Sequence, residues 1–194
     1  MLAQHFSQLL TNPRTSLEAA EKQPAGLFDI VLHIVILALI PTVCGYVATV
    51  YIGWDLGAGE RFFIPAATAL PIAIVAFITF SVGVFALGYA IQWVAAGSFE
   101  LKPAYLQCVK LALFTSVPIF LTGFSALLPV LIFDFSIGLL AVAAALFLLY
   151  TGAPIFLHIP KEKGFVFSTW VVVIALVMLV MILGLSVFFF SHIR

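Results

Sequence analysis

Charged residues are scarce in this chain of 194 residues, because Lys, Arg, Asp and Glu together make up only 8% of it. Soluble domains carry about 25% charged residues. Hydrophobic residues make up 64% of the chain, against about 45–50% in ordinary soluble domains. This composition excludes a water-soluble globular fold and predicts a membrane protein.

Cysteine is equally rare, with two residues in the whole chain. Cys44 falls in the middle of one apolar run and Cys108 near the start of another, so a disulfide between them is not expected. Isolated buried cysteines usually pack as small apolar side chains. No redox or metal role is predicted for them.

Recognisable catalytic motifs are missing as well. The chain has no nucleophile elbow, glycine-rich phosphate loop, zinc-protease helix or paired-carboxylate motif. It also lacks the series of intramembrane carboxylates or arginines that pumps and voltage sensors need. We therefore predict no enzyme, no cofactor and no nucleic-acid partner; a membrane enzyme using Asp29, His33 or His158 is the weakest alternative.

Five long apolar runs are what the sequence does contain. Each reaches the roughly 20 residues needed to cross the hydrocarbon core as a helix. A β-barrel would require alternating faces, whereas residues 141–150 are apolar on every side. The predicted fold class is an all-α integral membrane protein, a five-transmembrane-helix bundle. Its spans are expected over residues 29–53, 65–96, 105–132, 135–157 and 165–190.

The segment before the first run, residues 1–28, is expected to stay outside the membrane. Leu9, Leu10 and Leu17 suggest a short amphipathic helix in it. The first apolar run begins too late and is too long for a signal peptide, so we predict an uncleaved anchor. Residues 29–194 form the predicted membrane domain.

Lys and Arg residues predict the orientation, because short loops rich in them stay on the cytoplasmic side. With the N-terminus inside, six of these residues fall on the cytoplasmic side and two outside. The inside set is Arg14, Lys22, Lys102, Lys110, Lys161 and Lys163, and the outside set is Arg61 and Arg194. The count predicts a cytoplasmic N-terminus and an outside C-terminus.

Small residues at four-residue spacing, Gly45, Thr49 and Gly53, form a candidate helix-packing face in the first span. Contact with another helix of the same chain is the favoured interpretation, and a homodimer contact is the alternative. Gly83 and Gly88 are candidates for the same role in the second span.

Prolines within the spans remove backbone donors and leave carbonyl groups that need other partners. Nearby hydroxyl groups, those of Thr42, Thr115, Ser116 and Thr151, are expected to supply them. Pro65 and Pro71 predict a tilted or broken second helix, and residues 128–136 predict a tight hairpin between the third and fourth. The sharper hypothesis is a small cavity or kink region formed by Pro41, Lys110, Ser116, Pro118, Tyr150, Thr151 and Pro154.

Few ionisable side chains lie near the spans, and such residues suggest function. Lys110 is expected to reach the cytoplasmic interface as an anchor, near lipid or the region of Glu100 and Glu162. Asp134 is expected to be hydrated at the outer hairpin. A metal or proton-relay role for His33 and His158 is a weak alternative. The outside loop, residues 53–61, is expected to be a solvated turn with Trp54 at headgroup level.

Several short strings resemble a known family when taken together. They are Asn12-Pro13-Arg14, Ile40-Pro-Thr-Val-Cys44, Ile52-Gly-Trp-Asp55, Val117-Pro-Ile-Phe-Leu121, and Tyr150-Thr-Gly-Ala-Pro-Ile-Phe-Leu157 followed by Lys161-Glu162-Lys163-Gly164. Nearly the whole chain resembles the bacterial, YohC-like branch of the Yip family, whose eukaryotic relatives were named for interacting with Ypt/Rab GTPases. The resemblance implies five spans, a cytoplasmic N-terminus and residence in a bacterial inner membrane. It implies no catalytic residues.

Two functions remain open from the sequence. The favoured one is a non-enzymatic membrane adaptor or organiser that binds lipids or a membrane-protein partner, or forms a homo-oligomer. The alternative is a small transporter, channel or lipid translocator, with a path between the third and fourth helices along Ser116 and Thr151.

Overall fold

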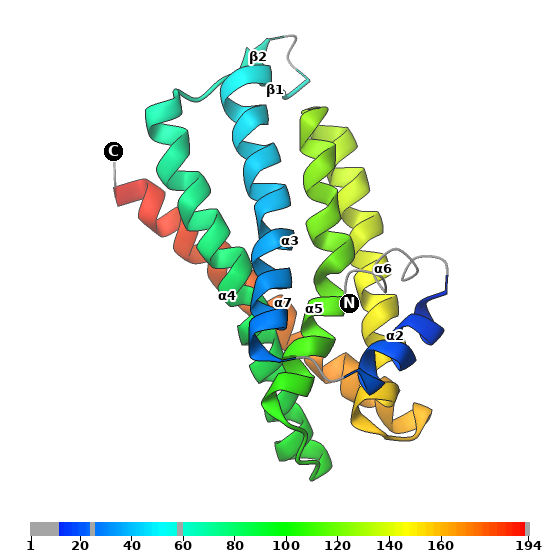
Figure 1. The fold of residues 1–194 in the computed structure, drawn as a ribbon. Coiled ribbons are helices and arrows are strands. Elements are labelled where there is room, and N and C mark those ends of the chain that lie inside the picture. Colours follow the sequence, from blue (N-terminus) through cyan, green and yellow to red (C-terminus); the bar gives the residue numbers. More distant parts are fainter. Residues whose placement is uncertain (1–11, 24–25, 58–59, 193–194) are drawn as a thin grey trace.

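The computed structural model describes residues 12–23, 26–57 and 60–192, and this part of the chain is mainly helical (Figure 1). The elements in chain order are the short helix α2 (Pro13–Lys22), α3 (Leu27–Val47) with the π-helical turn η1 (Ala48–Ile52), the strands β1 (Trp54–Asp55) and β2 (Arg61–Phe62), α4 (Ala66–Phe99), α5 (Tyr105–Leu121) with the 3₁₀ segment η2 (Thr122–Leu127), α6 (Leu131–Leu157) and α7 (Lys161–His192).

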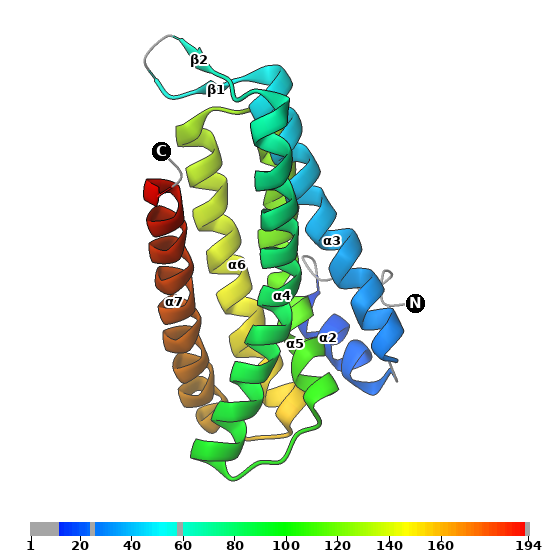
Figure 2. The same cartoon turned by 90° about the vertical axis from the view of Figure 1, so that its left-hand side faces the viewer.

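The helices α3 to α7 are all long and apolar enough to cross a membrane, which confirms the predicted fold class. Successive helices run in opposite directions, so α2 lies at one end of the bundle and α7 runs towards the other (Figures 1 and 2). The short helix expected before the first span is α2, with Leu17 buried; Leu9 and Leu10 lie outside the described residues.

The turn between the third and fourth spans lies earlier than the sequence suggested. The helical part of the third span ends at Leu127, before the predicted residue 132, and α6 begins at Leu131, before the predicted residue 135. Pro129 has no N–H and cannot continue the helical hydrogen bonding. Residues 128–130 therefore make the link, and the predicted tight hairpin is present.

Helix α4 is continuous from Ala66 to Phe99, so of the two forms expected for the second span, tilted or broken, the broken one is wrong. Pro65 is the N-cap and Pro71 lies in the second turn, close to the helix N-terminus. A proline there removes only the bond to the Ala67 carbonyl. The remaining turns of this apolar helix proceed without interruption.

A short β-hairpin stands where a solvated turn was expected. Its strands are antiparallel and pair Trp54 with Phe62 and Asp55 with Arg61. The Asp55 N–H donates to the Pro129 carbonyl oxygen at 2.8 Å, and Trp54 Nε1 donates to Thr49 Oγ1 at 3.1 Å. These bonds fasten the hairpin to the α5–α6 turn and to the end of the first span.

Helix α5 occupies the centre of the bundle and packs against α3, α4 and α6. Its span, Tyr105–Leu127, has a mean hydropathy of 1.6, against 2.4 to 2.5 for the other four spans. It is nevertheless the most buried of the five. This arrangement is reasonable in lipid, because the most apolar helices face the acyl chains and the central helix carries the polar side chains.

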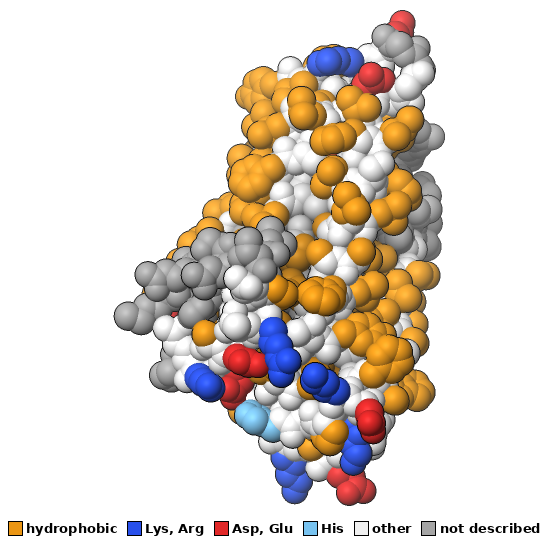
Figure 3. Space-filling model, turned by 90° about the vertical axis from the view of Figure 1, so that its right-hand side faces the viewer, with side chains coloured by type: hydrophobic (Ala, Val, Ile, Leu, Met, Phe, Trp, Pro, Cys, Tyr) orange, Lys and Arg blue, Asp and Glu red, His pale blue; other side chains and the backbone are white. Residues whose placement is uncertain are grey.

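Charged side chains gather at the end of the bundle that carries α2, which we call the basic end. Figure 3 shows them below a flank without charged groups, with a few more at the β-hairpin end. The name refers to its Lys and Arg residues, Arg14, Lys22, Lys102, Lys161 and Lys163, which lie among acidic residues such as Glu18, Glu100 and Glu162. The two polar ends and the apolar flank between them match a membrane-spanning bundle.

Candidate functional site

Helix α2 is docked against the basic end of the bundle. Pro13 occupies its first position, where a missing N–H costs nothing. Leu17 and Ala20 are completely buried, and the Leu17 side chain lies near Gly152 of α6. Thr15, Ala19 and Lys22 are exposed. The helix is therefore amphipathic, with its apolar side fixed to the bundle.

Lys110 of α5 lies beneath α2 rather than at the lipid interface. The residue is only 5% exposed, and its Nζ donates to the Gln23 carbonyl oxygen at 2.6 Å. It lines a cavity of about 310 Å³ together with Glu21 and Gln107. The expected snorkelling towards Glu100 and Glu162 is wrong, because the end of α2 folds over the lysine and offers it a carbonyl and a nearby carboxylate.

Gln107, one turn before Lys110, donates a short hydrogen bond from Nε2 to the Phe156 carbonyl oxygen. In a continuing helix that carbonyl would accept from the N–H of residue 160, but residue 160 is proline. Gln107 therefore replaces a backbone bond that α6 cannot make. It joins the central helix to the C-terminal end of α6.

The two candidate histidines have different partners. His158 ends α6 in a left-handed conformation, with φ at 53°, and its Nε2 lies 3.4 Å from Glu21 Oε1 of α2. His33 Nδ1 forms a hydrogen bond of 2.6 Å with the Asp29 carbonyl oxygen. In the described ranges no three His, Cys, Asp or Glu residues gather into a metal-binding group. His158 thus belongs to the contact between α2 and α6.

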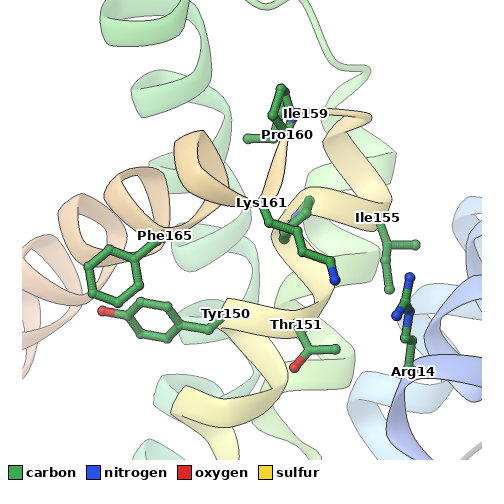
Figure 4. A pocket seen from close by; sticks show the side chains of 9 residues that line it. Arg14, Tyr150, Thr151, Ile155, Ile159, Pro160, Lys161 and Phe165 are labelled. Atoms are coloured by element: carbon green, nitrogen blue, oxygen red, sulfur yellow. The ribbon is translucent and has the colours of Figure 1, made fainter.

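Three of the predicted cavity residues, Tyr150, Thr151 and Pro154, line one cavity of about 560 Å³. We call it the basic-end pocket (Figure 4). It lies between α2, α6 and the start of α7, not between α5 and α6. Its other lining residues are Arg14, Ile155, Ile159, Pro160, Lys161 and Phe165.

The side chains of the pocket divide into an aromatic side and a basic side. The Tyr150 and Phe165 rings lie together at one side, with their centroids 5.2 Å apart. Arg14 lies at the other side, and the Lys161 side chain extends between them (Figure 4). Arg14 Nε also donates to Glu18 Oε1 at 3.1 Å. The pocket thus combines two cationic groups with apolar and aromatic walls.

Hydroxyl groups in and beside the pocket have distinct roles. Thr169 Oγ1 donates to the Phe165 carbonyl oxygen at 3.0 Å, so in its 2.9 Å bond with Tyr150 the phenol is the donor. The hydroxyl hydrogen of Tyr150 is therefore already engaged in a hydrogen bond with Thr169. The Thr151 hydroxyl has no hydrogen bond to any described residue, which leaves it available to a ligand.

The remaining predicted residues of α5 do not join this pocket. Ser116 Oγ donates to the Ala112 carbonyl oxygen at 2.8 Å, and Thr115 Oγ1 donates to the carbonyls of Leu111 and Ala112. Pro118 has no N–H to donate to the carbonyl of Phe114, the residue four positions before it. The expectation that these hydroxyls serve the proline-freed carbonyl is wrong, because each reaches back to the preceding turn instead.

Prolines within the helices serve as packing surfaces for glycine. Helices α3 and α6 continue through Pro41 and Pro154. A Cβ on Gly123 would collide with the Pro41 backbone, and one on Gly164 would stand 2.5 Å from Pro154 Cγ. Thr42 Oγ1 donates to the Ala38 carbonyl, again not to the carbonyl freed by proline.

The Gly45, Thr49 and Gly53 stripe is not a close helix contact in this chain. Among the described residues, no heavy atom lies within 4 Å of the position that a Gly45 Cβ would take. Thr49 Oγ1 donates to the Gly45 carbonyl at 2.7 Å. Gly53 has φ at 82° and lies beneath the Phe63 ring, so its role is a turn. The in-chain packing favoured from the sequence is wrong at Gly45.

Other glycines make the close contacts between helices. A Cβ on Gly88 of α4 would stand 2.6 Å from Val109 Cγ2, and one on Gly152 of α6 would stand 2.7 Å from Leu111 Cδ1. The expectation for Gly88 is confirmed, whereas Gly83 has no atom of the described residues within 4 Å of its Cβ position. Both close contacts involve the central helix α5.

Sequence reasoning missed Gln107 and Glu21, and it used Arg14 and Lys161 only to count charges. The sequence did contain a signal for Gln107. Gln107 and Lys110 both lie in the span with the lowest mean hydropathy of the five, and polar residues in such a span call for a buried partner. Arg14 and Lys161 are separated by most of the chain, and no spacing rule brings them to one pocket.

Comparison with known proteins identifies the family. The family model described as the Yip1 domain matches residues 7–182. The chain belongs to the Yip1 family. It is similar to the inner membrane protein YohC of Escherichia coli strain K12, with 31% identity over 160 residues that cover 82% of each protein. The YohC protein of Escherichia coli O6:H1 matches with the same identity and coverage.

No solved structure matches the chain. The Yip1 family match and the YohC relatives confirm the resemblance noted from the short strings. Together with the five apolar helices, they place this Yip1-family protein in the bacterial inner membrane as a multi-pass protein.

Proposed function

We propose that this Yip1-family protein is a non-enzymatic membrane adaptor that presents helix α2 to a protein partner. The observation that carries the proposal is that α2 is fixed to the bundle by contacts on one side and at its C-terminal end. Its apolar side is held by Leu17 and Ala20, and its C-terminal end by the Lys110 bond to Gln23. An extramembrane helix fixed in this way needs little reordering when it binds.

The outward side of α2 is suited to protein recognition. Thr15, Ala19 and Lys22 are exposed at positions i, i+4 and i+7, and so follow one face of the helix. If the predicted orientation holds, this face lies in the cytoplasm, next to the polar surface of the membrane. A helix presented in that position supports docking more readily than passage of a solute.

The interface between α5 and α6 favours the adaptor over a transport path. Leu111 of α5 lies against Gly152 of α6, and the Phe114 and Phe156 rings have their centroids 6.5 Å apart. Large side chains therefore occupy the region where the alternative path was expected. We retain the adaptor as the proposed function.

Photo-crosslinking from α2 tests this proposal in native membranes. A crosslinking amino acid at the exposed Ala19 is expected to capture one protein in stoichiometric yield, and native mass spectrometry should find the same complex intact. The Lys22→Glu variant should reduce that complex, because it reverses a charge on the same face. A crosslinker at Ser98, exposed elsewhere at the basic end, is the matched control.

Three outcomes would contradict an adaptor role. The first is that the crosslinker at residue 19 gives only lipid adducts and no protein adduct. The adducts from Ala19 and Ser98 could be identical, which would indicate random collision. Crosslinks solely between copies of this chain would make α2 an oligomer contact instead.

A further inference from the structure

We infer that the basic-end pocket binds the headgroup of an anionic phospholipid, with the lipid's acyl chains lying along α6 and α7. The inference goes beyond the adaptor proposal, since it concerns a lipid and does not need a protein partner. It starts from the charges that the fold brings to the pocket.

Two cationic side chains converge there from distant parts of the chain. Arg14 comes from α2 and Lys161 from the first position of α7. None of the lining residues that the structure describes is acidic. Glu18, beside the pocket, is paired with Arg14 through Nε, and this contact does not engage the two Nη groups. Guanidinium nitrogens in that arrangement suit a phosphate group.

The walls of the pocket suit the apolar part of a lipid. Ile155 and Phe165 line it, and Phe165 is 63% exposed on the outer flank of α7. The pocket is therefore open to the side on which lipid surrounds the bundle. An acyl chain can leave the cationic groups and continue along the exposed apolar surface without crossing water.

The donor inventory favours an anionic headgroup over a zwitterionic one. Thr151 supplies a hydroxyl and the two cations supply positive charge. None of the described lining residues offers a carboxylate to an ammonium group, and Glu18 beside the pocket is already paired with Arg14. A headgroup carrying its own ammonium would place that charge near Arg14 and Lys161. A glycerol headgroup would instead bring only hydroxyls and the phosphate charge.

Native mass spectrometry of the full chain in neutral detergent tests the inference, with phosphatidylglycerol and phosphatidylethanolamine offered at equal concentration. One phosphatidylglycerol per chain is expected to remain bound in preference to phosphatidylethanolamine. The double variant Arg14→Gln/Lys161→Gln should weaken its binding about tenfold, since each basic group adds to the attraction of anionic lipid. The control Lys22→Gln/Lys163→Gln removes the same charge from the same two helices outside the pocket. It should change binding less than about twofold, because these exposed side chains do not line the pocket and salt screens their charge.

A second variant tests whether the pocket itself, and not only its positive charge, is needed for lipid binding. Thr151→Leu keeps both cations and fills part of the pocket, and should also weaken phosphatidylglycerol binding. Thermal unfolding midpoints equal to that of the unmodified protein would show that the variants fold. Millimolar inorganic phosphate should leave the bound lipid in place, because it cannot use the apolar walls.

The inference is overturned by any of three results. Equal retention of the two lipids would remove the charge argument. Equal binding by the pocket and control double variants would place the lipid elsewhere. Displacement of the lipid by inorganic phosphate would assign the pocket to a soluble anion. Each result concerns lipid alone, so it is distinguishable from failure of the Ala19 crosslinking experiment.

Discussion

Gln107 and Lys110, one turn apart on α5, each supply a donor to a backbone carbonyl of another element. Gln107 serves Phe156, whose helical donor is absent because residue 160 is proline. Lys110 serves Gln23 at the end of α2. In a buried, apolar setting, a carbonyl without a donor costs more than a typical hydrogen bond contributes. These two side chains therefore hold elements that backbone bonding cannot join.

Replacing Gln107 with leucine should destabilise the bundle by about 1–3 kcal/mol, since it leaves the Phe156 carbonyl without its donor. The measurement is unfolding in detergent with increasing denaturant. Gln92→Leu is the control, because Gln92 donates to the carbonyl of Pro103 in a loop, where water can replace it. Equal effects of the two substitutions would refute this role for Gln107.

Replacing Lys110 with methionine should loosen α2 while the five spans stay folded. The substitution keeps an unbranched side chain but removes the bond to Gln23 and the positive charge near Glu21. Hydrogen exchange of the α2 amides should then accelerate about tenfold, as expected for loss of one charged hydrogen bond. Lys22→Met changes an exposed lysine of the same helix and should leave exchange unaltered.

At the scale of elements, the helices meet where glycine permits close approach. The 3₁₀ segment η2 packs on α3 through Gly123 and Pro41, and α6 packs on α5 through Gly152 and Leu111. Small residues let backbones come together in a membrane, where van der Waals packing replaces the hydrophobic effect between helices. Gly45 fits the same sequence pattern, but no heavy atom of the described residues lies within 4 Å of its Cβ position.

Gly123→Ala and Gly45→Ala should therefore differ sharply. The new methyl group at residue 123 would meet the Pro41 backbone and force η2 away from α3, costing about 1–3 kcal/mol. The methyl group at residue 45 meets no described atom and should be neutral or slightly stabilising. Thermal unfolding in detergent measures both. Equal destabilisation would mean that the stripe on α3 is a contact after all, such as one in a homodimer.

At the scale of the whole molecule, an odd number of alternating spans places α2 and the end of α7 on opposite sides of the membrane. The Lys and Arg distribution predicts that the α2 side is cytoplasmic. In the structure, Arg14, Lys22, Lys102, Lys161 and Lys163 of that count lie at the basic end, whereas Arg61 lies in β2 of the β-hairpin. The orientation of these two ends relative to the cell is tested separately.

Cysteine labelling of intact spheroplasts measures the orientation. Leu56→Cys, at the β-hairpin end, should react with an impermeant maleimide in intact spheroplasts. Ser98→Cys, at the basic end, should react only after permeabilisation. The native Cys44 and Cys108 are buried, so the unmodified chain gives the background. The reverse labelling pattern would invert the predicted topology.

The length and hydropathy of the apolar runs were sufficient to predict the fold class. A run of about 20 apolar residues can adopt few stable structures other than a membrane-spanning helix. The same local information indicated the tight turn before α6 and the short helix in the N-terminal segment. Proline positions were less informative, since a proline near the start of a helix, such as Pro71, does not interrupt it. Family membership could also be inferred from the sequence, because several short motifs of the family occur together in it.

Only the tertiary structure decided which helix is central, which glycines are contacts and where the pocket lies. Arg14, Thr151 and Lys161 become neighbours because α2 folds back against α6 and α7, and Lys110 is enclosed because the same helix covers it. Apolar length depends on each segment's own residues, so it can be read along the chain. Contact depends on how the faces of separate helices pack together, and that is a property of the assembled bundle.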